Sequence, residues 1–147
     1  MSNRFWAIPF LLVCAAVTQT AFALDPVYSD PSGKAIWGYD PLSYFAGEPE
    51  EGKEELSHQW NGAVWHFISE ENRQAFIKEP ERYAPQYGGY CAWAVSQGYT
   101  ASTDPHAWNI TDGRLYLNYS RSVALRWKID KATNIEKADN NWPSLSQ

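Results

Sequence analysis

Residues 60–91 read WNGAVWHFISEENRQAFIKEPERYAPQYGGYC, and this is the most informative stretch of the chain. It contains, in order, a tight turn, an amphipathic helix, a proline, a glycine pair and a cysteine. Ser69 is a favoured N-cap residue, and the acidic side chains that follow it suit the positive end of a helix dipole. Pro80 cannot continue a helix. The stretch therefore predicts a helix over Glu70–Lys78.

The turn at Asn61-Gly62 predicts a β-hairpin. This dipeptide is preferred in two-residue type I′ turns, because both positions need a positive φ. A turn there pairs Trp60 with Ala63 and extends the hairpin over residues 58–68. Side chains alternate between the two faces of a strand. We therefore expect His58 and His66 to point to opposite faces, where they cannot hold one metal ion together.

Cys91 to Gln97 predicts a short helix that ends at Gly98, although the letters YCAWAV also fit a buried strand. In the helical interpretation Cys91 lies at the N-terminus. The helix dipole would then lower the pKa of the thiol and favour thiolate. The alternative is an inert cysteine that packs as a small hydrophobic residue.

The remaining patterns predict short elements joined by loops. We expect an acidic loop over Glu48–Glu55 and a glycine-rich loop over Tyr83–Gly89. The other predicted elements are a helix over Pro41–Ala46 with Asp40 as its N-cap, a hairpin of Trp108–Thr111 with Leu115–Asn118, and a helix over Ser122–Ala138. Strands and helices follow each other without a βαβ rhythm. The sequence therefore predicts a small single α+β domain with antiparallel β-hairpins packed against short helices.

The N-terminus has the features of a signal peptide. Arg4 precedes an uncharged apolar run over Phe5–Val17, and Ala21-Phe22-Ala23 is a small-x-small cleavage signal. The run is shorter than the ~20 residues that span a bilayer, so a retained anchor is the less favoured alternative. We expect residues 1–23 to be removed and residues 24–147 to form one domain with no membrane span. The protein would be exported, either periplasmic or secreted.

The charge of the chain argues against two classes of partner, and its cysteine content argues against a disulfide-stabilised fold. The chain has a formal net charge of −5 and no Lys/Arg cluster, which argues against binding to nucleic acid or to anionic membranes. It has two cysteines, of which Cys14 lies in the predicted signal peptide. Cys91 alone cannot close an internal disulfide, so the domain must be stabilised by packing.

Five segments carry a family resemblance. They are GYDPLSYF (38–45), WNGAVWHFISEENRQAF (60–76), PERYAPQYGGYCA (80–92), DPHAW (104–108) and DGRLYLN (112–118). Together they resemble a YHS domain, in the order found in secreted members that consist of this domain alone. The resemblance runs to Pro143. It implies a small module often associated with transition metals, in a group of proteins without an established activity.

The metal-associated relatives have a cysteine in a Phe-Cys-Ser segment and a second cysteine four residues later. Here those places are taken by Ile68 and Asn72. Neither side chain is a soft metal ligand. If a transition metal such as copper or zinc binds, we expect weak binding through Cys91 with at most one histidine, for which His66 is the candidate. The alternative for His66 is a satisfied, partly buried ring.

Two further sets of residues are candidates for function. Cys91, His106 and Asn109 supply the residue types of a Cys-His-Asn site, in which a base deprotonates the thiol. The alternative for His106 is a residue of a surface loop. Three tryptophans (Trp60, Trp65 and Trp93) could line an apolar pocket for a flat ligand, although dense aromatic rows usually form a core. The sequence therefore predicts a binding or accessory module for a small ligand or a metal, with a thiol-dependent enzyme or redox protein as the alternative.

Overall fold

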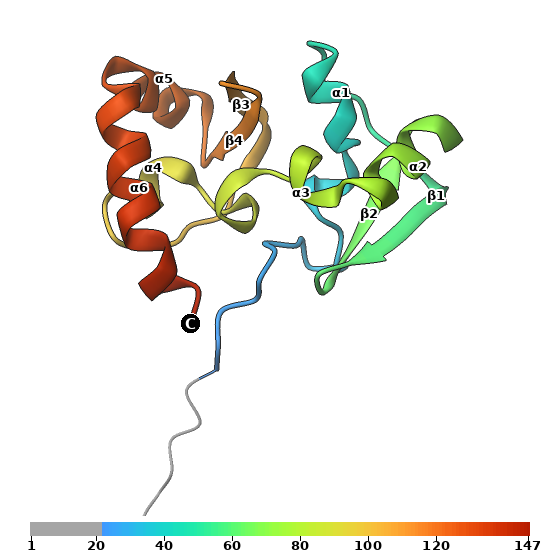
Figure 1. Ribbon diagram of the computed structural model, residues 1–147, viewed down its shortest axis with the longest axis horizontal. Coiled ribbons are helices and arrows are strands. Elements are labelled where there is room, and N and C mark those ends of the chain that lie inside the picture. The colour runs from blue at the N-terminus through green and yellow to red at the C-terminus, as the bar shows by residue number, and fades with distance from the viewer. Residues whose placement is uncertain (1–21) are drawn as a thin grey trace, which may run out of the picture.

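The computed structural model describes residues 22–147, so the predicted signal peptide of residues 1–23 lies outside it except for its last two residues. Helices and two hairpins alternate along this part of the chain (Figure 1). The elements are η1 Ile36–Gly38, α1 Pro41–Phe45, β1 Lys53–Trp60, β2 Ala63–Phe67, α2 Glu70–Lys78, α3 Pro80–Tyr83, η2 Gln86–Gly89, α4 Ala92–Ser96, β3 Asp104–Thr111, β4 Arg114–Asn118, α5 Arg121–Ile129 and α6 Lys131–Leu145. The predicted α+β fold with antiparallel hairpins is confirmed.

Both hairpins form as their turn sequences predict. β1 pairs with β2 so that Trp60 lies opposite Ala63. Asn61 and Gly62 take φ values of 51° and 82°, as a type I′ turn requires. The turn between β3 and β4 is built in the same way, with φ values of 51° at Asp112 and 72° at Gly113.

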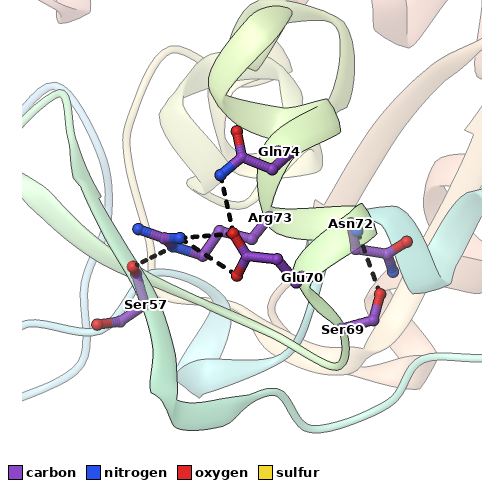
Figure 2. A network of polar contacts seen from close by, with 6 residues as sticks. All are labelled: Ser57, Ser69, Glu70, Asn72, Arg73 and Gln74. Carbon is purple, nitrogen blue, oxygen red and sulfur yellow. Dashed lines mark hydrogen bonds and ion pairs between the residues drawn. The ribbon is translucent and has the colours of Figure 1, made fainter.

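α2 has the predicted bounds and is held against β1 by polar contacts at its N-terminus (Figure 2). The Ser69 hydroxyl accepts a hydrogen bond from the backbone N–H of Asn72 at 3.1 Å. Arg73 donates from Nε to the carbonyl oxygen of Ser57 on β1 at 2.9 Å and also contacts the Glu70 carboxylate. The helix cap and the contact with the strand thus come from the same turn of the helix.

The structure corrects three of the predicted boundaries. β1 begins at Lys53, inside the stretch Glu48–Glu55 for which the sequence predicts a loop. Its pairing with β2 shifts register between Lys53 and Ser57, so the first residues join the strand through an irregularity that no pattern marks. Pro80 ends α2 but also begins α3, where its missing N–H costs no hydrogen bond. The expected loop over Tyr83–Gly89 contains η2.

The single helix predicted over Ser122–Ala138 is wrong, because the chain forms two helices that meet at Asp130. Asp130 is not helical, with φ −135° and ψ 61°. The buried side chain of Asn134 donates from Nδ2 to the carbonyl oxygen of Trp127 at 3.0 Å and satisfies the end of α5. α6 then continues to Leu145. Neither α6 nor another helix within residues 22–147 has the length and apolarity needed to cross a membrane.

The core consists of two hydrophobic clusters that share strand β4. Leu115 and Leu117 belong to a first cluster with residues of η1, α1, β2 and α2. Tyr116, which lies between them in the strand, belongs to a second cluster with residues of η2, α4, α5 and α6. Because side chains alternate along a strand, β4 contributes one face to each cluster. The two halves of Figure 1 are therefore joined through a strand that is buried on both sides.

The segment before η1 is ordered and packs on η2. The backbone N–H of Tyr28 donates to the carbonyl oxygen of Gly88 at 2.8 Å. Gly88 has φ 62°, and a Cβ atom there would collide with the carbonyl oxygen of Pro26. A glycine is needed at this position both for its backbone conformation and for the close approach of the N-terminal segment.

Candidate functional site

A pocket of about 320 Å³ opens at the seam between the two hydrophobic clusters. Its walls come from the N-terminal segment, the β1–β2 turn, the chain from α3 to η2 and the C-terminal end of α6. The lining residues are Pro26, Val27, Trp60, Asn61, Trp65, Glu81, Ala84, Pro85, Gln86, Tyr87, Gly88, Trp142 and Ser146. We call this hollow the aromatic pocket.

Two pairs of inclined aromatic rings form much of the wall of the aromatic pocket. Trp60 and Trp65 lie 5.8 Å apart between ring centroids, with 58° between their planes. Tyr87 and Trp142 lie 6.0 Å apart, with 61° between their planes. The first pair packs with the first cluster and the second pair with the second cluster. The pocket therefore depends on how the two halves of the domain meet.

In the tryptophan pair, one ring is fully buried and held by a hydrogen bond, and the other ring is only partly buried. Trp65 is fully buried, and its indole N–H donates to the carbonyl oxygen of Trp60 at 3.0 Å. The Trp60 ring is only partly buried and also meets Phe76 edge-on, with 5.7 Å between centroids. The hydrogen bond across the hairpin turn holds the Trp65 ring, so the position of the pair follows from the Asn61-Gly62 turn.

The tyrosine side of the pocket is fixed by an unusual backbone and by a carboxylate. Tyr87 has φ 56°, a rare conformation for a residue with a large side chain. Its hydroxyl donates to Oδ1 of Asp139 on α6 at 2.8 Å. Burial and the neighbouring Asp139 carboxylate raise the pKa of Tyr87 far above its usual value, so the phenol stays neutral. η2 and α6 are thereby joined at the pocket wall.

The third tryptophan of the predicted ligand site lies elsewhere, so the structure corrects the idea of one pocket lined by all three. Trp93 lies on α4, where the guanidinium carbon of Arg126 is 5.2 Å from its ring centroid. With Cys91, Tyr99 and Tyr119 it lines a second hollow of about 220 Å³. The reason is that α4 packs on α6 in the second cluster, away from the β1–β2 hairpin.

Cys91 caps α4, as the helical interpretation predicts, but its thiol is buried with an exposed fraction of 1%. Its sulfur accepts from the backbone N–H of Tyr119 at 3.3 Å and donates to Oδ1 of Asn118 at 3.6 Å. Burial raises the pKa of the thiol, and nearby backbone N–H groups only partly oppose this effect. The expected lowering of the pKa is therefore reversed, because the loss of solvent outweighs the donors at the helix end.

His106 and Asn109 are not brought to the thiol. His106 is exposed, and its Nε2 lies 3.1 Å from the hydroxyl of Tyr39. Asn109 lies opposite Tyr116 in the β3–β4 hairpin, and its side chain accepts a hydrogen bond from the Thr111 hydroxyl. Within residues 22–147, neither is a polar partner of Cys91. The Cys-His-Asn arrangement of a thiol enzyme is not assembled in this structure.

His66 lies on β2 in a third hollow, together with Lys34 and Glu54. The Cys91 thiol lines a different hollow, so the two candidate metal ligands are separated. The register of the hairpin places His58 opposite Trp65 and His66 opposite Ser57, so the histidines face opposite sides as predicted. Among the described residues, no group of three or more His, Cys, Asp and Glu side chains could hold a metal ion.

Ile68 and Asn72 both contact one buried carboxylate. The backbone N–H of Ile68 and Nδ2 of Asn72 donate to Oδ2 of Asp40, at 2.9 Å and 2.8 Å. Oδ1 of Asp40 accepts from the N–H of Leu42 at 2.8 Å. The amide of Asn72 thus takes part in a hydrogen-bonded connection between α1 and α2.

Sequence reasoning did not identify Tyr87, Trp142 and Glu81 as pocket residues. The string Tyr87-Gly88-Gly89 signals close approach of the backbone, and this could have drawn attention to Tyr87. Trp142 lies beyond the helix that the sequence predicts over Ser122–Ala138, and nothing in the local pattern indicates that α6 returns it to the β1–β2 hairpin. Glu81 looks like any exposed residue of a short helix.

Comparison with models of known protein families, with curated proteins and with solved structures gave no match to this chain.

Proposed function

We propose that this protein is an exported YHS-type binding or accessory module that holds a small, largely apolar ligand in the aromatic pocket. The proposal rests on one observation, the meeting of two aromatic pairs from different clusters at a single hollow. The resemblance of the five sequence segments to YHS domains supports the assignment to that group. The signal-like N-terminus supports export.

The size and the lining of the pocket suit a small organic molecule. Ligand pockets commonly enclose about 300–1,000 Å³ and combine apolar walls with a few polar groups. The aromatic pocket, at about 320 Å³, lies at the lower end of that range. Asn61, Gln86 and Ser146 are the polar, uncharged side chains of its lining. These groups can orient a ligand whose body lies against the rings.

The geometry favours this ligand class over the other two candidates. A transition metal would need several soft or nitrogen ligands, and Cys91 and His66 lie in different hollows. A thiol enzyme would need a base beside Cys91, and the recorded partners of its sulfur are Asn118 and the backbone of Tyr119. The aromatic pocket requires no rearrangement of this kind.

The experiment is a thermal-shift screen of the purified protein with small aromatic molecules, haem, copper and zinc. A ligand at about 100 times its Kd stabilises a folded protein by about 2.7 kcal/mol. We expect small aromatic molecules to raise the melting temperature. The Trp60→Leu and Trp142→Leu variants should lose that shift, because each removes one ring of a pair.

The matched control is Trp93→Leu, which changes a tryptophan of the second hollow. It should keep the ligand-induced shift of the unmodified protein. A shift that disappears in Trp93→Leu and persists in Trp60→Leu would place the ligand beside Cys91 instead. Turnover of a thioester or peptide that is abolished by Cys91→Ser would contradict the binding-module proposal.

A further inference from the structure

The lining of the aromatic pocket carries a negative charge. Among the residues that line it, Glu81 is the only side chain charged at neutral pH within the described part of the chain. A second carboxylate, Asp139, lies behind the pocket wall and accepts the hydrogen bond of Tyr87. The whole chain is also acidic, with a formal net charge of −5. The Arg114 guanidinium also acts on Tyr87 and opposes these charges, but the lining itself carries only the negative charge of Glu81, which favours a cation over an anion.

The rings favour the same sign of charge. The faces of Trp and Tyr rings carry negative potential, and they attract a cation that lies within about 6 Å of the ring centroid. Three tryptophans and one tyrosine contribute to the lining: Trp60, Trp65, Trp142 and Tyr87. Because burial and Asp139 raise the pKa of Tyr87, this ring remains a neutral phenol. Tyr87 therefore contributes the face of a neutral ring and no charge of its own.

The side chains that line the aromatic pocket indicate which class of cation it can bind. An inorganic metal ion needs several oxygen, nitrogen or sulfur ligands, and this lining provides a single carboxylate beside aromatic rings and uncharged side chains. A protonated primary amine keeps three N–H donors that each need an acceptor. A quaternary ammonium group has no N–H and spreads its charge over methyl groups, which can lie directly on the rings.

We infer that the aromatic pocket binds a quaternary ammonium or similarly methylated organic cation. The partly exposed rings of Trp60 and Trp142 contact the charged head, and Glu81, an exposed residue of the lining, supplies the negative charge. Asn61 and Gln86 are available to a polar tail. This inference rests on the proposed function, since it names the ligand class of the same pocket.

The test compares a cation with its neutral isostere. The purified protein is titrated with choline and with 3,3-dimethyl-1-butanol, which replaces the charged nitrogen by carbon, and tryptophan fluorescence and calorimetry report binding. We expect choline to bind about tenfold more tightly, a difference typical of a desolvated cation–π contact. Benzyltrimethylammonium and tert-butylbenzene form a second pair for a larger apolar body.

Two variants separate the charge from the shape of the pocket. Glu81→Gln should weaken choline binding several-fold and reduce its dependence on salt, while binding of the neutral isostere stays unchanged. Glu71→Gln is the matched control, because Glu71 is an exposed residue of α2 outside the pocket lining. It should leave both affinities unchanged. Circular dichroism and the melting temperature verify that both variants are folded.

The outcomes distinguish the two proposals. Equal or tighter binding of the neutral isosteres through Trp60 and Trp142 would overturn the cation inference and leave the small-ligand function standing. Failure of every cationic and neutral probe to bind, together with a negative thermal-shift screen, would overturn both. Choline binding that persists in the Trp60→Leu and Trp142→Leu variants would also overturn the inference, because the site would then lie elsewhere.

Discussion

Asp40 connects two helices and a strand end through one buried carboxylate. Its Oδ1 accepts from the N–H of Leu42 in α1, and its Oδ2 accepts from Ile68 after β2 and from Asn72 in α2. The residue has no exposed surface. A buried carboxylate is tolerated only when its oxygens are hydrogen-bonded, and here both oxygens are. Asn72 is therefore explained by its role as a donor to Asp40.

We expect Asp40→Asn to lower the free energy of unfolding by about 2–3 kcal/mol. The substitution replaces an accepting oxygen with an NH₂ group that must face the existing N–H donors. At least one buried group is then left without a partner. Urea unfolding of the two proteins, followed by circular dichroism, measures the difference.

The control for Asp40→Asn is Glu48→Gln, which neutralises an exposed carboxylate eight positions after the helix cap residue Asp40, beyond the end of α1. Changes at exposed positions usually stay within about 0.5 kcal/mol. A loss in Asp40→Asn no larger than that of the control would mean that the carboxylate contributes little to the connection between α1 and α2.

At the scale of elements, the predictions succeeded where the signal is local. The Asn61-Gly62 turn fixes the register of β1 with β2, and the Ser69 cap fixes the start of α2. The sequence does not predict the break between α5 and α6, because the break depends on a side chain of α6 that hydrogen-bonds to the last turn of α5. Asn134 reaches back to Trp127, and its side chain replaces a backbone donor at the end of α5. A polar residue in a helical pattern gives no warning of such a contact.

The N-terminal segment is an element whose docking can be tested through one glycine. Gly88→Ala places a methyl group against the carbonyl oxygen of Pro26 and adds strain at a positive φ. We expect the segment to detach, and the free energy of unfolding to fall by more than the ~1–2 kcal/mol of backbone strain alone. Urea unfolding gives the loss of stability. Limited proteolysis should show new cleavage close to Tyr28.

The matched control for this prediction is Gly113→Ala. Gly113 also has a positive φ, 72° against 62° at Gly88, but no atom lies within 4 Å of the added Cβ. The control therefore carries the backbone strain without the collision. Equal losses of stability in the two variants, with no new cleavage in Gly88→Ala, would show that the N-terminal segment does not depend on the close approach at Gly88.

At the scale of the whole molecule, the aromatic pocket could not be read from the sequence because its parts are brought together by the core. β4 presents Leu115 and Leu117 to one cluster and Tyr116 to the other, and this sets how the halves meet. The sequence predicts Trp60, at the end of β1, as a residue that lines an apolar pocket. Trp142 joins it only because α6 packs on α4 and extends to the seam. Local sequence patterns do not indicate that Trp60 and Trp142 line the same pocket in the folded chain.

The two clusters also bury several weak acids whose folded-state pKa values are raised. Burial raises the pKa of Tyr44, which packs in the first cluster, and of Tyr87 and Cys91 in the second half. Their usual values are 10.0 for tyrosine and 9.0 for cysteine. A raised pKa in the folded state means that the unfolded chain loses its proton first. The stabilising effect is complete below the usual value and is lost as the pH rises above it.

We therefore expect the free energy of unfolding to begin to fall near pH 9 and to fall more steeply above pH 10, because Cys91 ionises in the unfolded chain before the tyrosines do. Each group contributes a slope of up to about 1.4 kcal/mol per pH unit. Urea unfolding at intervals between pH 7 and pH 11 measures the curve. Cys91→Ser should flatten the part between pH 9 and pH 10, whereas Tyr87→Phe should flatten only the part above pH 10. A curve that keeps the same shape in both variants would mean that neither group is shielded from solvent as the structure indicates, and the pH dependence would then have to come from the molecule's overall charge.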